Sequence, residues 1–89
     1  DVLLQEAIAL QAEKKYAASA RLYQRLLEQN RENGRAFLGL LDTLRNAMLD
    51  SLKNQKQADL NAQAATHKKF FPDVPLPDGV QQRLAQGNK

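Results

Sequence analysis

Residues 3–44 read LLQEAIALQAEKKYAASARLYQRLLEQNRENGRAFLGLLDTL, and they decide the fold of this 89-residue chain. Apolar residues recur every three or four positions, which places them on one face of an α-helix. The spacing is interrupted twice, so the stretch predicts an antiparallel helix pair and the opening of a third helix. Such a pattern is typical of α-solenoids, in which each helical unit buries one face against the next.

The first interruption separates two predicted helices. The first covers residues 2–13, with Asp1 as its N-cap because a carboxylate accepts hydrogen bonds from free backbone N–H groups. Lys14–Lys15 then breaks the periodicity, and the apolar stripe restarts out of register at Tyr16. Neither Gly nor Pro marks this break, so one long helix to Asn30 is the competing interpretation.

The second interruption precedes the most strongly patterned helix of the chain. Gly34 is expected to close the preceding helix at the C′ position, where a residue of positive φ is favoured. A third helix is predicted over residues 35–49, and it either continues to Lys53 or gives way to a new helix capped by Asp50 or Ser51.

The pattern weakens in the second half of the chain. Residues 53–57 form a polar bridge, and an alanine-rich helix is predicted over residues 58–71. Pro72 ends this helix, and all three prolines lie in residues 72–79, which must be extended or turning. A short last helix is expected at residues 80–85.

The predicted fold is therefore all-α, with about four helices in antiparallel hairpins and a Pro-rich C-terminal arm. Residues 1–71 form the helical domain, and residues 72–89 form an extended arm with a short terminal helix, or a linker. A chain of this length holds one domain at most, or a piece of a larger one. Because it opens with Asp1 and not Met, we expect a piece of a longer protein.

Composition excludes several classes of function. Without cysteine, the chain has no disulfides, thiolate metal sites or Cys nucleophile, and its compartment stays unknown. No apolar run approaches the roughly 18–20 residues that cross a bilayer, and no signal peptide opens the chain. The net charge of +3 arises in residues 34–89, and so mild an excess usually marks a solvated surface.

The residues that carry chemistry do not form a recognisable centre. His67 is the single histidine, and its nearest acids, Asp59 and Asp73, make a poor metal site. Ser19 and Ser51 have no Gly-rich elbow or oxyanion loop around them. The sequence therefore predicts no enzyme and no catalytic, cofactor or metal site, with the histidine on a helix surface or at an interface.

Three further residues stand out within the helical pattern. Tyr16 and Tyr23 lie on one helix face, and both are interpreted as packing residues whose hydroxyls reach solvent or a backbone carbonyl. Gly39 falls inside the third helix, where glycine costs about 1 kcal/mol relative to alanine. Its presence indicates a close approach of another helix, or of a ligand, or else a neutral surface glycine.

The helix pair resembles a tetratricopeptide repeat, a unit of 34 residues with large and small side chains at set places. The resemblance covers one unit and the start of a second. The positions that carry it are Leu3, Ala7 and Leu10 in the first helix, Tyr16, Ser19, Tyr23 and Leu26 in the second, and Phe37, Leu40 and Leu44 where the pattern resumes.

The resemblance implies an interaction scaffold. In such repeats the first helices of successive units line a concave groove that binds an extended peptide or a helix. Transferred to this chain, the partner-binding residues are Leu4, Ile8, Gln11, Arg35, Leu38, Asp42 and Arg45. The groove would be apolar, with both arginines at its rim, unless the leucines and the isoleucine belong to the core instead.

The predicted function is non-catalytic binding of a protein or peptide partner, as a segment of a larger assembly. The Gln- and Ala-rich composition associates the chain with bacterial secretion, pilus or envelope assemblies. One alternative is a structural helical domain that buries its apolar faces in a homo-oligomer. A second is weak nucleic-acid binding through Lys53, Lys56, Lys68 and Lys69, although the basic residues form no stripe with interleaved aromatics.

Overall fold

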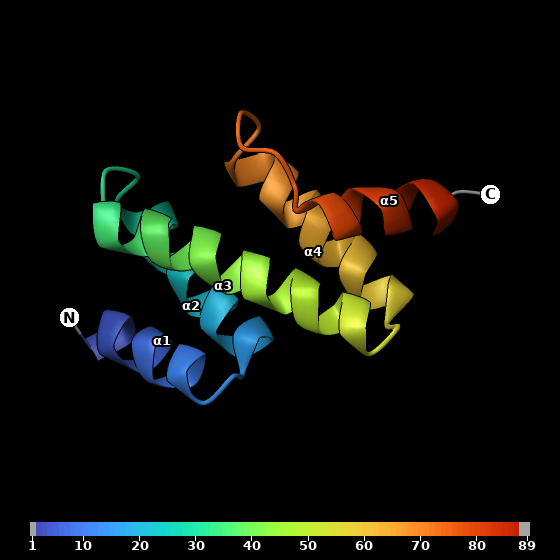
Figure 1. The fold of residues 1–89 in the computed structure, drawn as a ribbon. Coiled ribbons are helices and arrows are strands. Elements are labelled where there is room, and N and C mark those ends of the chain that lie inside the picture. Colours follow the sequence, from blue (N-terminus) through green and yellow to red (C-terminus); the bar gives the residue numbers. More distant parts are fainter. Residues whose placement is uncertain (1, 88–89) are drawn as a thin grey trace. The chain divides into compact units, whose positions relative to one another are not determined.

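The computed structural model describes residues 2–87, which form five α-helices (Figure 1). They are α1 (Val2–Ala12), α2 (Tyr16–Gln29), α3 (Gly34–Lys53), α4 (Gln57–Phe70) and α5 (Asp78–Gly87). The all-α prediction is confirmed. The prediction of about four helices is too low, because the short helix expected at residues 80–85 extends over ten residues. The proposed cap at Asp1 lies outside the described residues.

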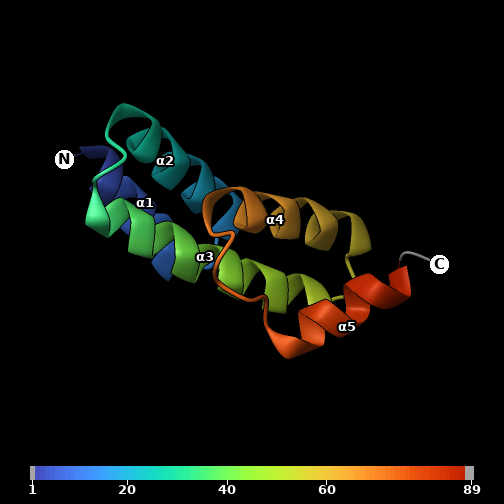
Figure 2. The same ribbon diagram turned by 90° about the horizontal axis from the view of Figure 1, so that it is seen from above.

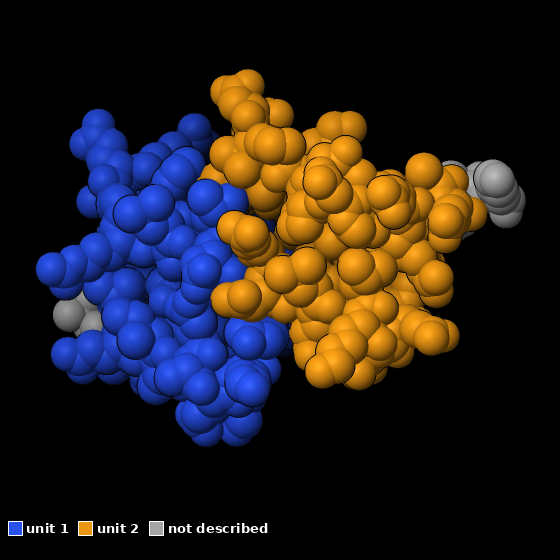
Figure 3. Space-filling model, viewed as in Figure 1, with its two compact units in different colours: residues 1–44 blue, residues 45–89 orange. Residues whose placement is uncertain are grey.

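The chain divides after Leu44 into two units, coloured separately in Figure 3. Unit 1 contains α1, α2 and the first part of α3, and unit 2 contains the rest of α3 with α4 and α5. None of the helices in residues 2–87 combines the length and apolar character that spanning a bilayer requires.

In unit 1, α1 and α2 pack as an antiparallel hairpin, and α3 runs in the same direction as α1 (Figures 1 and 2). The centre of the hairpin is a buried serine, since Ser19 Oγ donates a 2.7 Å hydrogen bond to the backbone oxygen of Ala7. The buried apolar residues of unit 1 are Ala7, Ala20, Tyr23, Leu26, Leu27, Ala36, Leu40 and Leu44.

In unit 2, the end of α3 and the whole of α4 are antiparallel, and α5 reverses direction again (Figures 1 and 2). Ser51 Oγ donates to Gln63 Oε1 at 2.9 Å, which links the first two of these helices. The buried apolar residues of unit 2 are Ala47, Met48, Leu60, Ala64, Phe71 and Val80.

Both hairpins turn through the same backbone motif. Lys14 and Gln55 have φ values of 65° and 58°, and the next residue in each case donates its N–H to a carbonyl five residues earlier. This is a Schellman motif, which closes a helix with one left-handed residue at C′. The break predicted at Lys14–Lys15 is thereby confirmed. Its cause is a left-handed lysine, a conformation that costs a non-glycine residue about 1 kcal/mol or more.

The prediction for Gly34 is wrong. None of the glycines in the described range has positive φ, α2 already ends at Gln29, and Gly34 is the first residue of α3. Two asparagine side chains, and not a glycine, form the connection between α2 and α3. Asn30 Oδ1 accepts from Glu32 N–H at 3.0 Å and turns the chain, and Asn33 Oδ1 accepts from Ala36 N–H at 3.1 Å and caps the next helix.

Helix α3 passes through Asp50–Ser51 without interruption, so the alternative of a new helix there is wrong. It has 20 residues against 11 in α1. The Schellman motif that ends α3 therefore comes 41 residues after the one that ends α1. Their matching carbonyl acceptors, for example, belong to Leu10 and Ser51. The period of 34 holds only where α3 begins, since about two extra helical turns are inserted before it ends.

Candidate functional site

Two of the predicted partner-binding residues are, after Val2, the most exposed large apolar side chains of α1 and α3. Leu38 is 65% exposed and Ile8 is 51% exposed, so the described residues do not cover either side chain. Leu4 and Gln11 are half-buried, and Arg35, Asp42 and Arg45 are exposed.

A hydrogen bond joins the two helices that carry these residues. Gln11 Nε2 donates to Asp42 Oδ2, although the two residues are 31 positions apart. Ile8 and Leu38 lie about one helical turn before this pair on their own helices, which run in the same direction (Figure 2). They therefore fall on the same side of unit 1.

Leu4 and Arg35 lie two helical turns before the same pair, again one residue from each helix. We call the residues Leu4, Ile8, Gln11, Arg35, Leu38 and Asp42 the α1–α3 surface. Arg45 follows one turn later on α3 and belongs to unit 2. Three of its six residues are apolar, with Arg35 at one end of the surface and the Gln11–Asp42 pair at the other.

Tyr23 supports this surface from the second helix. Its hydroxyl donates a 2.7 Å hydrogen bond to Gln11 Oε1, so the same amide binds a tyrosine on one side and a carboxylate on the other. The network ties α1, α2 and α3 together within unit 1. The predicted packing role of Tyr23 is confirmed, but its hydroxyl donates to a side-chain amide oxygen and not to solvent or a backbone carbonyl.

Gly39 allows Tyr23 to reach that position. A Cβ atom on Gly39 would lie 2.9 Å from Tyr23 Oη and closer still to ring carbons Cε1 and Cζ. The close helix approach inferred from the sequence is thus confirmed, and its partner is an aromatic ring. The sequence signal was available, because a helical glycine faces one of few aromatic residues in the chain.

The pKa of Tyr23 is raised above 10.0, first by burial and second by the negative charge of Asp42. The folded chain therefore favours the neutral phenol. This contribution to stability is fully present below the pKa of an unfolded tyrosine and is lost as the pH rises toward the higher pKa of the folded state.

We expect the free energy of unfolding to fall between about pH 8 and about pH 10.5 by more in the native chain than in Tyr23→Phe. Urea unfolding at the two pH values measures this difference. The phenylalanine variant is the matched control, because it keeps the ring beside Gly39 and removes only the titrating hydroxyl. An equal pH dependence in both chains would contradict the assignment.

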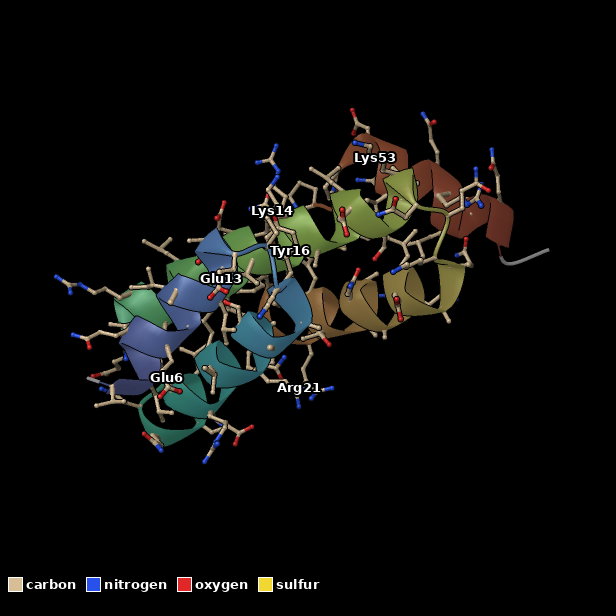
Figure 4. The ribbon with its side chains drawn as sticks, turned by 90° about the horizontal axis from the view of Figure 1, so that it is seen from below. Glu6, Glu13, Lys14, Tyr16, Arg21 and Lys53 are labelled. Carbon is tan, nitrogen blue, oxygen red and sulfur yellow. The ribbon has the colours of Figure 1, made fainter. Side chains whose placement is uncertain are left out.

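Charges around unit 1 are mixed in sign. Glu6, Glu13, Lys14 and Arg21 all lie exposed at its surface (Figure 4). Alternating charges of this kind are typical of a solvated helical surface and not of a basic stripe that follows a phosphate backbone. Nothing in this distribution favours nucleic acid as the partner of unit 1.

His67 is only 3% exposed, so the expectation that it lies on a helix surface is wrong. Its Nε2 lies 2.9 Å from the backbone oxygen of Val74, and its ring packs beside Phe71. Within residues 2–87, no three His, Cys, Asp or Glu side chains come together as a metal site would need.

The sequence reasoning missed two features of the site. One is the role of Tyr23 in holding Gln11 against Asp42, which depends on the pairing of helices that are distant in sequence. The other is the apolar exposure of Val2 and Phe37, at 70% and 41%, on the same two helices. Comparison of the chain with protein-family models, with curated proteins and with solved structures found no match.

Proposed function

We propose that this chain is a protein–protein interaction module that binds an extended peptide or a helix on the α1–α3 surface. The observation that carries the proposal is the exposure of Ile8 and Leu38 side by side on neighbouring helices. Large apolar side chains gathered on one surface are favourable in water only when a partner covers them.

The finer architecture behind this proposal is a helical repeat of the tetratricopeptide kind. Two helical hairpins that close through the same Schellman motif support it, as does the parallel course of α1 and α3. In a solenoid the first helices of successive units lie in parallel and form the binding surface. Because α3 is longer than α1, the hairpin of α3 and α4 is an extended version of the hairpin of α1 and α2.

The network of Tyr23, Gln11 and Asp42 supports the proposal in a second way. It holds α1 and α3 in fixed register by hydrogen bonds that do not involve Ile8 or Leu38. A rigid frame reduces the entropy that binding would otherwise cost. Ile8 and Leu38 take no part in this network, so their side chains are available to contact the partner.

A capture experiment tests the proposal. The native chain, Ile8→Glu/Leu38→Glu and Ala17→Glu/Ala18→Glu are each immobilised and exposed to native extract, and bound proteins are identified by mass spectrometry. All four substituted positions are exposed, so all three chains are expected to fold. A partner retained by the native chain and the alanine-site control should bind the Ile8/Leu38 variant about tenfold or more weakly.

Light scattering on the purified chain measures its molar mass and so distinguishes a homo-oligomer from a monomer that binds another protein. A dimer of the native chain that dissociates in Ile8→Glu/Leu38→Glu would show that a second copy covers the surface. Capture of the same proteins by all three chains would overturn the proposal, because the charge reversal of an apolar contact must weaken binding there.

A further inference from the structure

Residues 71–87 follow α4, and their first turn is held by one histidine. Phe71 N–H donates to the backbone oxygen of His67 at 2.7 Å, and Val74 N–H donates to the oxygen of Phe71 at 3.1 Å. Val74 in turn offers its own oxygen to His67 Nε2 at 2.9 Å. The imidazole therefore pins the far end of the turn back onto α4.

The hydrogen-bond pattern sets the protonation state of this imidazole. A carbonyl oxygen can only accept, so Nε2 must carry the proton that it donates to Val74. Nδ1 is buried and has no hydrogen-bond partner. A neutral ring leaves only a lone pair at that position, whereas a protonated ring would place an N–H there with nothing to accept it.

An unsatisfied buried donor is among the more costly defects in a protein interior. A second proton on His67 therefore favours any state in which Nδ1 reaches water. Opening the turn at residues 71–74 takes the Val74 oxygen away from Nε2, and the freed imidazole can then turn until Nδ1 meets water. Proton uptake and opening are thus coupled.

Helix α5 depends on the same turn. Its first turn is built on the segment just before it, since Gln81 N–H donates to Pro77 O and Gln81 Nε2 to Leu76 O. Val80 is fully buried, and Arg83 Nε donates to Gln57 Oε1 at 3.1 Å.

No charged side chain of the described part of unit 2 bonds to the imidazole of His67. The charged side chains are Lys68 and Lys69 after it on α4, Asp73 in the turn, Arg45, Asp50 and Lys53 on α3, Lys56 and Asp59 at the start of α4, and Asp78 and Arg83 on α5. Both ring nitrogens are accounted for, one by Val74 and one without a partner, so none of these groups bonds to the ring.

We propose that His67 is a proton-operated latch that holds residues 71–87 on α4 when neutral and releases them when protonated. Release uncovers Val80 and the face of unit 2 beneath α5. The device belongs to unit 2 and stands whether or not the α1–α3 surface binds a partner.

Hydrogen exchange tests the latch. Amide exchange is followed by NMR at about pH 7.5 and about pH 5.5 and corrected for the intrinsic effect of pH on exchange. The native chain should lose protection at the Gln81 amide, which donates to Pro77 O, by about tenfold at the lower pH, while Leu26 in unit 1 changes little. His67→Gln should not respond, because its amide keeps a donor for Val74 and cannot take up a proton.

Two outcomes would overturn the latch. The first is an equal loss of protection in the native chain and in His67→Gln, and the second is unchanged protection of residues 71–87 in the native chain at the lower pH. If His67→Gln does not fold, nitrogen chemical shifts of the native ring decide the matter. They must report a proton on Nε2 alone at about pH 7.5 and exposure of the ring to water after protonation.

Discussion

Replacing Gly39 by valine lowers the free energy of unfolding by about 3 kcal/mol. Any Cβ at this position lies inside contact distance of the Tyr23 ring. The ring is 2% exposed and its hydroxyl is bonded to Gln11, so it cannot move away without losing that hydrogen bond and part of its packing. The gain of about 1 kcal/mol from removing a helical glycine is too small to compensate.

Urea unfolding followed by circular dichroism measures the effect. Gly39→Ala is a milder version that should still destabilise the chain if valine prevents folding. Gly34→Ala is the matched control, because a Cβ there meets nothing within 4 Å. We expect that control to be neutral or slightly stabilising. A Gly39→Val chain as stable as the native one would show that Tyr23 does not occupy this position.

Replacing Leu60 by alanine lowers the free energy of unfolding by a similar amount, about 3 kcal/mol. Leu60 is 1% exposed and is among the largest fully buried side chains of unit 2. Truncation removes apolar contacts and leaves a cavity that the helices of this unit fill only in part. The sequence alone predicts a weak core here, because the surrounding helix is rich in alanine.

The control is Lys68→Ala on the same helix. Its side chain is exposed, so the change should stay within about 0.5 kcal/mol of the native chain. Calorimetry or urea unfolding distinguishes the two variants. If Leu60→Ala is as stable as Lys68→Ala, then Leu60 does not belong to a packed core, and the register of α4 must differ from the one described.

Local periodicity was enough to place most helices. The break at Lys14–Lys15 was visible because the apolar stripe changes phase there, and phase is a property of neighbouring residues. The end of α2 was missed for a different reason. Glycine is the usual left-handed residue, but here Lys14 and Gln55 take that conformation and two asparagines close the loop before Gly34.

The α1–α3 surface could be predicted in part. The resemblance to a tetratricopeptide repeat indicated Ile8 and Leu38 as surface residues but left a core position open, and the bonds of Gln11 to Tyr23 and Asp42 could not be read from spacing. Tyr23 lies 12 positions from Gln11, and Asp42 lies 31 positions from it, so these side chains meet only after three helices have packed. Many helix pairings are compatible with one sequence pattern.

The amino-acid sequence by itself predicted that the chain is helical and favoured a break at Lys14–Lys15, and it offered a close helix approach as one of three interpretations of Gly39. These features depend on side-chain spacing and on the size of single residues, which act within one or two helical turns. Only the tertiary structure decided that His67 is buried, that α3 continues to Lys53, and that Tyr23 joins Gln11 to Asp42. Burial and hydrogen bonding of polar groups depend on which distant surfaces meet, and that choice is made by the packing of whole helices.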